Sequence, residues 1–465
     1  MVRGTNKGGW MTARAVVWFR RDLRLNDNPA WASASETADR VTALYVLDPT
    51  LLRGAGEFRR AQLLAHLHAL DNSLRPYDGR LMVRHGKAET IVPEVAAACG
   101  AALVCANADV TPYARRRDSA IKDLLGSGFQ RWWGNLVHPP GTVLTARGRT
   151  SRVFTPFAAK WNRLPLTTWP ENAPVAVDDD TGEGLPPLDP EPFQPGGEEA
   201  AAGRLLEFSQ RADRYDETRD LPAFDGTSVL SADLRFGTLA PRRVVATVGT
   251  STGGRAAFVR QLAWRDWYAH LLWELPSMVD SSLRTELGRI RWENDPTDIA
   301  AWKEGRTGYP FIDAGMRQLA TTGWMHNRVR MAAASFLVKD LLVDWRVGER
   351  WFRRLLVDAD IAQNAGNWQW VAGTGPDAAP YFRVFNPVLQ SEKFDPDGAY
   401  IRAFVPELAG IMAPWIHRPW TAPVGELAAG GVTLGATYPH PIIDHRFARS
   451  RTVNAYAEAT RATHD

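Results

Sequence analysis

The chain has 465 residues, of which 45% are hydrophobic and 23% charged, and its formal net charge is +3. This length predicts two or three domains, and a charge so near balance neither requires nor excludes nucleic acid as a partner. The two cysteines, Cys99 and Cys105, lie in apolar surroundings, which disfavours a disulfide framework, a zinc site or an iron–sulfur cluster. No run approaches the ~20 apolar residues that cross a bilayer, and no secretory signal is recognisable. We therefore expect a cytoplasmic protein.

Apolar runs typical of strands buried on both faces alternate with helical patterns in the first part of the chain. These runs occupy residues 15–19, 41–47, 80–86 and 102–106, with a weaker one at 129–133. Such alternation predicts a doubly wound parallel sheet. We expect an α/β N-terminal domain of residues 14–138 with this fold.

Residues 139–200 are rich in proline, glycine and acidic residues, which is typical of a connection between domains. From residue 201 onward the pattern is helical and rich in tryptophan, without a convincing alternating strand. The sequence therefore predicts a linker of residues 139–200 and an all-helical domain of residues 201–465.

A helix is predicted over residues 254–276, and one of its faces combines aromatic, cationic and amide side chains. The members of this face are Gln261, Trp264, Arg265 and Tyr268. Such a face is suited to lining a cavity that holds a flat ring. The alternative is a packed helix whose arginine extends to solvent.

A second helix is predicted over residues 323–342. Its mixed face carries Trp324, Asn327, Arg328 and Met331, while His326 and Arg330 lie on the next face. We interpret the lone histidine as a hydrogen-bonded structural residue. Because an unpaired buried charge costs several kcal/mol, Arg330 is expected to pair with a carboxylate, and Asp358 is the candidate.

The run AGNWQW at residues 365–370 places two tryptophans in a loop-like Asn/Gly segment beside Asp358 and Asp360. Either these tryptophans are part of the core, or a flat aromatic molecule binds here. Asn364 is suited to presenting an amide to a polar ring atom. Upstream, a hydroxyl-rich segment precedes a possible helix and predicts either simple N-capping or an anion site suited to a pyrophosphate. Its residues are Tyr215, Thr227, Ser228 and Ser231.

Several long runs, in this order, resemble the photolyase/cryptochrome family over about residues 14–420. They are VVWFRRDLRLNDNPA, TGYPFIDAGMRQLATTGWMHNRVRM, DWRVGERWF, DADIAQNAGNWQW and GPDAAPYFRVFNPVLQSEKFDPDGAYIRAFVPEL. The chain is most similar to bacterial cyclobutane pyrimidine dimer photolyases of the deazaflavin-antenna type. The absence of GxGxxG after the first strand agrees with the resemblance, because in this family FAD lies in the helical domain.

The resemblance implies a FAD site in the helical domain. Tyr215, Thr227, Ser228 and Ser231 would hold the phosphates and the ribityl chain. Arg330 and Asp358 would form a salt bridge over the isoalloxazine, Asp360 would contact the ring edge, and Asn364 would face the flavin N5. Electrons would pass inward through a tryptophan chain that consists of Trp292, Trp345 and Trp368.

The resemblance also implies that UV-damaged DNA is the partner and that the protein is a monomer without a metal or a membrane anchor. Trp264 and Trp370 would form two walls of a pocket for the lesion, which photolyases flip out of the duplex. Asn327, Arg328 and Met331 match other positions of that pocket, and Arg219 and Arg383 would contact DNA phosphates. The expected reaction is light-driven electron transfer from reduced FAD, which opens a cyclobutane pyrimidine dimer.

The match departs from the family's dimer-repairing members at Gln261, where those enzymes usually carry glutamate. Glutamine at this position is similar to animal cryptochromes and (6-4) photolyases, yet Asn327 stands where the (6-4) enzymes have a second histidine. The alternatives to dimer repair are a cryptochrome photoreceptor and a photolyase with a shifted lesion preference. Residues 421–465 are too few for a large signalling module, which favours the lyase. A flavin oxidoreductase would need a nicotinamide site, for which no motif is visible.

A second chromophore is expected in the α/β domain. Residues 106–118, ANADVTPYARRRD, resemble the deazaflavin-binding photolyases more than the folate-binding ones. Asp109 and the LDP at residues 47–49 should lie at the carboxyl ends of the strands, where α/β sheets bind ligands. A plain turn before a basic helix is the alternative. Arg20, Arg21 and Arg24 are interpreted as structural, paired with acids of their own domain.

Overall fold

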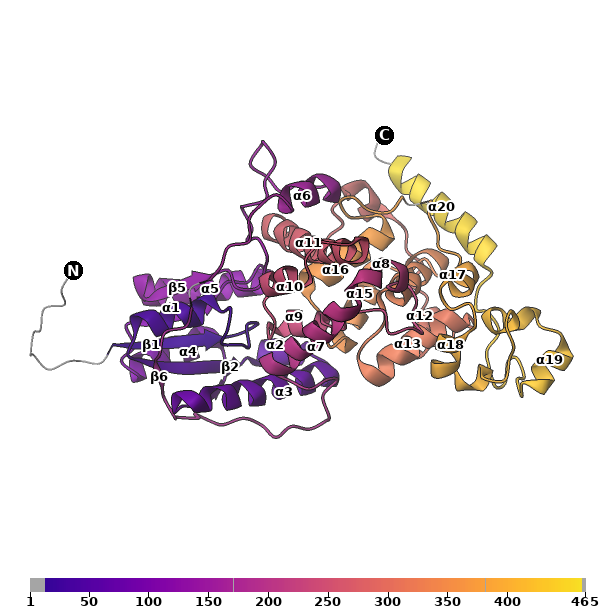
Figure 1. The fold of residues 1–465 in the computed structure, drawn as a ribbon. Helices are drawn as coiled ribbons and strands as arrows, with labels where there is room; N and C mark the ends of the chain where they lie inside the picture. Colours follow the sequence, from indigo (N-terminus) through magenta and orange to yellow (C-terminus); the bar gives the residue numbers. More distant parts are fainter. Residues whose placement is uncertain (1–12, 170, 381, 462–465) are drawn as a thin grey trace, which may run out of the picture.

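The computed structural model describes residues 13–169, 171–380 and 382–461, and Figure 1 shows an α/β part joined to a larger helical part. The five predicted strands are β1 (Arg14–Phe19), β2 (Arg40–Leu47), β3 (Leu81–His85), β4 (Leu103–Asn107) and β5 (Phe129–Trp132). They form a parallel sheet in the order β3-β2-β1-β4-β5. The predicted doubly wound sheet is therefore confirmed, and its strand order reverses direction at β1.

Helices cover both faces of this sheet, as its strands without polar alternation require. The helices of this part are α1 (Pro29–Thr37), α2 (Pro49–Arg53), α3 (Glu57–Leu74), α4 (Ala88–Ala98) and α5 (Pro112–Leu125). On one face, Trp31 of α1 and Leu67 of α3 join one core cluster. On the other, Val92 of α4 and Ile121 of α5 join a second. Both cysteines are free thiols.

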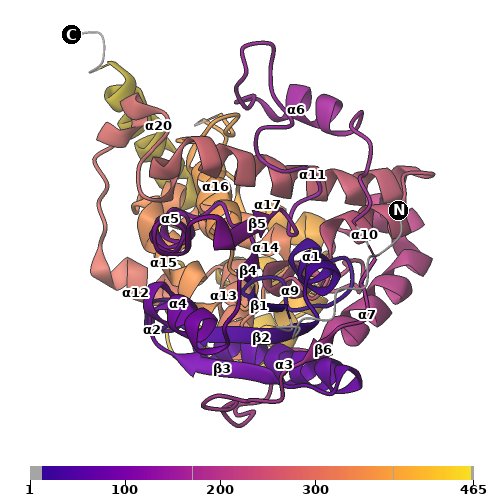
Figure 2. The same ribbon diagram turned by 90° about the vertical axis from the view of Figure 1, so that its left-hand side faces the viewer.

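The connecting segment 139–200 is attached to both parts of the molecule. Its strand β6 (Ala176–Val177) pairs in parallel with the start of β2. Its helix α6 (Phe154–Trp161) lies beside α11 (Gly253–Glu274), as Figures 1 and 2 both show. The buried Asp266 of α11 accepts a hydrogen bond from the Trp161 indole N–H at 2.8 Å. The described part of this connection is therefore fixed to the sheet and to the helices.

The rest of the chain is helical, as predicted. Its earlier helices are α7 (Glu198–Arg211), α8 (Tyr215–Thr218), α9 (Ser231–Phe236), α10 (Pro241–Val248), α11, α12 (Pro296–Glu304) and α13 (Pro310–Thr322). They are followed by α14 (Asn327–Ser335), a π-helical turn (Phe336–Asp340), α15 (Trp345–Leu355), α16 (Ile361–Ala372), α17 (Pro387–Phe394), α18 (Ala399–Phe404), α19 (Val424–Ala429) and α20 (His445–Arg461). No described helix is long and apolar enough to span a bilayer.

Helices α15 and α16 pack closely because a glycine lies at their contact. A Cβ atom at Gly348 of α15 would lie 2.0 Å from the Cη2 atom of Trp368 on α16. Trp368 also meets Phe352 at a ring-centroid distance of 5.0 Å and Trp302 at 6.3 Å. The indole of Trp368 is thus enclosed on several sides by the largest core cluster of the helical part.

Candidate functional site

Helix α16 is the central element of the site. The AGNWQW run, expected to be loop-like, lies inside this helix, so that expectation was wrong. The Asp360 carboxylate accepts a hydrogen bond from the Gln363 backbone N–H at 3.1 Å, which caps the first turn. Tertiary packing outweighs the low helix propensity of the Asn/Gly run, since Asn364 and Trp368, one turn apart, are both buried.

Asn364 is held by an acid that the sequence did not single out. Its side-chain N–H group donates to the backbone oxygen and to the Oε1 atom of Glu349, both at 2.9 Å. Burial raises the pKa of Glu349, which is only 2% exposed. The Oδ1 atom of Asn364 receives no hydrogen bond from the described residues. In the sequence, Glu349 belongs to a strongly charged helix and resembles a solvent-exposed residue.

Arg330 and Asp358 form the predicted ion pair. The two guanidinium nitrogens Nη1 and Nη2 lie 3.1 and 2.8 Å from the two carboxylate oxygens, a bidentate geometry. The Nε–H group of Arg330 donates to the backbone oxygen of Met325 at 2.7 Å. This pair therefore has a fixed orientation beside α16.

The helix predicted over residues 323–342 begins later than expected. Gly323 closes α13 in the left-handed conformation, with φ of 68°, and α14 starts at Asn327. Trp324 therefore does not share a helical face with Asn327, Arg328 and Met331, and that prediction was wrong. His326 is the N-cap of α14, where its Nδ1 atom accepts from the Arg328 backbone N–H at 3.2 Å, as its structural interpretation predicted.

The hydroxyl-rich segment forms a strained loop. Val229, between Ser228 and Leu230, has a positive φ of 51°, which is unfavourable for a β-branched residue and is typical of ligand-binding loops. Ser228 Oγ accepts a weak 3.4 Å hydrogen bond from the Leu230 N–H. Within the described chain, the hydroxyls of Thr227 and Ser231 have no hydrogen-bond partner. Tyr215 is half-buried nearby in sequence, at the start of α8.

The three tryptophans of the expected electron chain differ in burial. Trp368 and Trp345 are buried, at 2% and 0% exposure, in the same core cluster. Trp292 is only partly buried and packs against that cluster from outside. Its ring also meets Tyr456 of α20, with ring centroids 6.2 Å apart. Two members of the set are thus interior, and Trp292 lies at the edge of the cluster.

The two expected walls of the lesion pocket lie on neighbouring helices, Trp264 on α11 and Trp370 on α16, and both are half-buried. One face of Trp264 is covered by Phe154 of α6, because the two rings stack at a centroid distance of 3.7 Å and an angle of 13°. Trp264 can therefore offer only its other face to a ligand. The role of Phe154 was not predicted, since it lies in the connecting segment.

Gln261 and the residues of α14 are placed as follows. The Gln261 amide donates to the Ala257 backbone oxygen of its own helix at 3.1 Å. Asn327 is exposed and its Nδ2 atom lies 3.7 Å from the Met331 sulfur. Arg328 forms a 2.9 Å ion pair with Asp220. This pair brings α14 next to the segment that carries Tyr215 and Arg219.

Two further expected residues are accessible. The Arg219 guanidinium lies over the Tyr215 ring at 5.8 Å. Arg383 is exposed, and its guanidinium lies 5.6 Å from the Phe385 ring. Neither guanidinium forms an ion pair with the carboxylates of the described chain. Both are therefore available to an anionic partner.

The arginines of the first strand–helix loop only partly follow the prediction. Arg20 pairs with Asp118 of its own domain at 2.7 Å. Arg21, however, pairs with Asp109 at 3.4 Å and also with Asp360 of the helical part. The Asp360 carboxylate is thus committed to the boundary between the two parts. Arg24 donates to backbone carbonyls, including that of Gly237 at 2.7 Å, and to no acidic side chain in the part of the chain that the structure describes.

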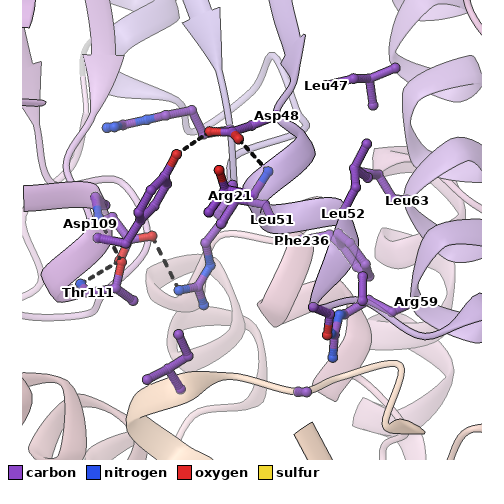
Figure 3. Close-up of a pocket in the computed structure, with 18 of the residues that line it drawn as sticks. Arg21, Leu47, Asp48, Leu51, Leu52, Arg59, Leu63, Asp109, Thr111 and Phe236 are labelled. Carbon is purple, nitrogen blue, oxygen red and sulfur yellow. Dashed lines mark hydrogen bonds and ion pairs between the residues drawn. The ribbon is translucent and has the colours of Figure 1, made fainter. Parts of the chain in front are cut away.

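A second candidate site is a cavity of about 530 Å³ at the carboxyl ends of β1 and β2 (Figure 3). Asp48 and Asp109 both line it, as predicted from the strand ends. Figure 3 shows Leu52, Leu63 and Phe236 on one side and the two aspartates on the other. Tyr113 donates its hydroxyl hydrogen to Asp48. Residues of α15 and α16 close the cavity from the helical part.

Comparison with known proteins was decisive. Residues 15–175 match the family model of DNA photolyase, and residues 258–458 match that of the FAD binding domain of DNA photolyase. Deoxyribodipyrimidine photo-lyases from Agrobacterium fabrum and Streptomyces griseus are 41% and 43% identical, covering 97% and 94% of this chain and 99% and 98% of their own. The chain belongs to the DNA photolyase family.

Solved structures of photolyases have the same fold. A bacterial class III photolyase from Agrobacterium tumefaciens matches with a TM-score of 0.90 at 38% identity, covering 98% of this chain and 100% of that one. An archaeal photolyase from Sulfolobus tokodaii, described with two FAD molecules, matches with a TM-score of 0.84 at 34% identity, covering 96% and 100%.

The residues of this photolyase-family chain fit a flavin. An amide acceptor at Asn364, a rigid bidentate ion pair at Arg330 and Asp358, and hydroxyls without partners at Thr227 and Ser231 are the groups that an isoalloxazine and a pyrophosphate require. The imidazole Nε2 atom of His326 is also buried, and the His326 ring lies against the Arg219 backbone, in the segment that carries Tyr215.

Proposed function

We propose that this protein repairs cyclobutane pyrimidine dimers in DNA with light. The observation that carries the proposal is that one buried helix, α16, presents Asn364, Trp368 and Trp370 together, beside the Arg330–Asp358 pair. Reduced FAD, when bound and excited, supplies the electron that opens the cyclobutane ring. The protein contributes binding, orientation and electrostatics to this chemistry.

Arg330, Asp358 and Asn364 would hold the isoalloxazine, and the segment with Tyr215, Thr227, Ser228 and Ser231 would hold the phosphates. Asn364 is oriented by Glu349, so its free carbonyl oxygen would accept a hydrogen bond from a ring N–H group. We revise the expected role of Asp360. Because its carboxylate pairs with Arg21 and caps α16, it would position the helix and not contact the ring edge.

Trp292, Trp345 and Trp368 would conduct an electron from the surface toward the FAD site. Indole suits this role because it is readily oxidised, and the half-exposed Trp292 can exchange with a reductant in solution. Gly348 would serve the same path indirectly, since it allows Trp368 to approach α15. These three tryptophans would thereby restore the reduced cofactor, while repair itself needs no electron from Trp292.

The lesion would lie between Trp370 and the free face of Trp264, with Gln261, Asn327 and Met331 around it. The stack of Phe154 on Trp264 would hold that indole in one orientation. This favours binding because less side-chain conformational entropy is lost when the lesion binds. Arg328, oriented by Asp220, would belong to the same pocket. Arg219 and Arg383 would contact phosphates, so affinity for DNA should fall with salt. We expect a monomer.

The second cavity would bind an antenna chromophore of deazaflavin type. We place it in an antenna-binding domain of residues 14–138, linked through residues 139–200 to a FAD- and DNA-binding domain of residues 201–465. Apolar side chains such as Leu52, Leu63 and Phe236 suit a planar ring, and Asp48 and Asp109 provide acceptors for its polar edge. The cavity also contacts α15 and α16, which brings the antenna near the FAD site.

The test is a repair assay on the FAD-loaded, anaerobically reduced protein. An oligonucleotide with one cyclobutane thymine dimer is illuminated with blue light beside a dark control, and products are separated by chromatography. We expect light-dependent return of intact thymines. An Arg330→Ala variant should lose FAD and repair together, whereas Arg75→Ala, on the opposite end of α3 from the cavity, should keep both.

One observation favours a second candidate. Gln261 replaces the glutamate that is usual in dimer-repairing relatives, which favours a shifted lesion preference. The same assay with a (6-4) photoproduct therefore runs in parallel. Repair of the (6-4) lesion alone would make that lesion, and not the dimer, the substrate. Failure to repair either lesion with FAD bound would contradict the proposed lyase activity.

A further inference from the structure

The lining of the second cavity has a large excess of positive charge. It contains ten arginines but only two acidic residues, Asp48 and Asp109. Five of these arginines are committed to partners: Arg20 and Arg117 pair with Asp118, Arg21 pairs with Asp109 and Asp360, and Arg59 and Arg235 donate to backbone carbonyls. The excess therefore does not serve internal ion pairing alone.

Of the other five arginines, Arg60 is exposed on α3, and four gather where the two domains meet. Arg53 ends α2, and Arg350, Arg353 and Arg354 lie on α15; we call these four the arginine rim. Arg53, Arg350 and Arg354 are exposed and form no ion pair within the described chain. Among the carboxylates of the described residues, Arg353 reaches only that of Glu349, at 3.4 Å.

The arginine rim is held in place from both domains. The backbone N–H of Gly56 donates to the Arg354 carbonyl at 3.0 Å. Arg59 of α3 donates to the carbonyls of Arg353 and Leu356 at 2.5 and 3.1 Å. These bonds fix the α2–α3 loop against the end of α15. The like charges of the rim are therefore kept together by the fold.

Burial is the main influence on two arginines of the cavity, and neighbouring positive charges add to it. Burial, and then the neighbouring charge of Arg353, lowers the pKa of Arg59 to about 10. Burial, and then Arg21, lowers the pKa of Arg235 to about 9. Arg20 adds two buried nitrogens, Nε and Nη2, that lack a partner among the described residues. A bound anion would relieve this repulsion.

We propose that the molecule in this cavity carries a tail with two or more negative charges, which binds the arginine rim while its ring lies against Leu52, Leu63 and Phe236. The inference rests on the proposed antenna role and specifies the chemistry of the antenna. A phosphorylated or oligo-carboxylate chromophore is selected over the same ring with an uncharged tail. Guanidinium groups suit such a tail because they bind phosphate and carboxylate in a bidentate manner.

The experiment compares matched probes on the FAD-loaded protein. Riboflavin is compared with FMN, and a bare 5-deazaflavin alcohol with its conjugate bearing a phosphodiester and glutamates, by equilibrium dialysis. We expect each charged probe to bind about 10-fold or more tightly than its neutral partner. The difference should shrink as salt rises, because the rim is exposed. A preference only for FMN identifies a terminal phosphate as the group that the rim binds, and a preference only for the conjugate identifies the longer tail of phosphodiester and glutamates.

The double variant Arg350→Ala/Arg354→Ala tests the rim directly. It should bind the charged probes as weakly as the neutral ones and leave binding of the neutral rings unchanged, whereas Arg75→Ala should behave as wild type. If the wild type binds neutral and charged probes with equal affinity at every salt concentration, the proposed charged tail is refuted. The proposed antenna role of the cavity is then kept. No binding of any probe overturns the antenna role as well.

Discussion

Arg21 of the α/β domain and Asp360 of the helical domain form an ion pair at the boundary between the two. Asp360 is at the same time the N-cap of α16, the helix that carries Asn364 and Trp368. Arg21 also reaches Asp109 on the wall of the second cavity. One guanidinium therefore joins the second cavity to the first turn of the helix that carries Asn364 and Trp368.

The variant Asp360→Asn should destabilise the protein by roughly 3 kcal/mol, because it leaves Arg21 with one carboxylate instead of two in a largely buried setting. Asparagine is as good an N-cap as aspartate, so the loss of stability measures the contribution of the negative charge. Burial alone would raise the pKa of Asp360, but Arg21, Arg265 and Arg235 outweigh it and hold that pKa well below its usual range.

The stabilisation from Asp360 should accordingly be complete above about pH 4 and be lost as the pH falls further. Urea unfolding of wild type and variant at several pH values measures both effects. A change within about 0.5 kcal/mol at pH 7, the range of ordinary surface substitutions, would show that the pair contributes little.

Buried histidines should make the protein sensitive to mild acid. Burial, and then Arg204, lowers the pKa of His66 to about 3, and burial lowers that of His326 to about 4. The Nδ1 atom of His66 accepts from the Gly197 N–H at 3.1 Å, so protonation would break a bond that fixes the start of α7.

Because the folded-state pKa values lie below the usual value near 6.5, stability should be full above that pH and fall as pH decreases toward 4. Each histidine should contribute about 1.4 kcal/mol per pH unit within this range. Unfolding free energies measured between pH 7 and pH 4.5 give the slope of stability against pH. His66→Gln should reduce that slope by the contribution of one proton, about 1.4 kcal/mol per pH unit. An unchanged slope in that variant would refute the assignment.

Gly348→Ala should be destabilising by about 1–3 kcal/mol, because the new methyl group overlaps the Trp368 indole. Gly203→Ala is the matched control. Gly203 lies inside α7 with open space around it, so alanine there should stabilise by about 1 kcal/mol through helix propensity. Thermal unfolding of both variants measures the two changes in stability. Equal changes would mean that α15 and α16 are not in close contact.

Trp368→Phe should block photoreduction of oxidised FAD and leave repair by chemically pre-reduced enzyme nearly intact. Phenylalanine fills most of the same buried space but is much harder to oxidise. Absorbance of the flavin under blue light with an external reductant measures the first property, and the dimer assay measures the second. Normal photoreduction in this variant would contradict the tryptophan chain.

Gln261→Glu should raise the yield of dimer repair several-fold. The present amide donates to the Ala257 carbonyl of its own helix, a bond that an ionised carboxylate cannot make, so glutamate should turn toward the lesion. The quantum yield of repair at saturating dimer is the measure, with Gln261→Ala as the control for loss of the amide. A yield that stays at the wild-type level would show that the residue at position 261 does not limit repair and that another residue hydrogen-bonds the lesion.

The sheet was predictable because β1, β2 and β4 are largely apolar runs between helical patterns. The Arg330–Asp358 pair was predictable because a buried cation requires an acid. Other features depend on contacts that local sequence does not contain. Arg21 and Asp360 are 339 positions apart, and Glu349 looks like a solvent-exposed helix charge until α16 is packed against it. The helical state of AGNWQW results from burial of Asn364 and Trp368, which outweighs an Asn/Gly composition typical of loops.

The position of Asp360 at the head of α16 sets a register for the whole helix. Successive helical residues are offset by about 100° around the axis. Deleting one residue between Asp360 and Asn364 would therefore rotate Asn364, Trp368 and Trp370 together while the interdomain anchor stayed in place. Flavin contact, electron supply and lesion stacking would fail at once, so this four-residue spacing should tolerate substitutions far better than any change in length.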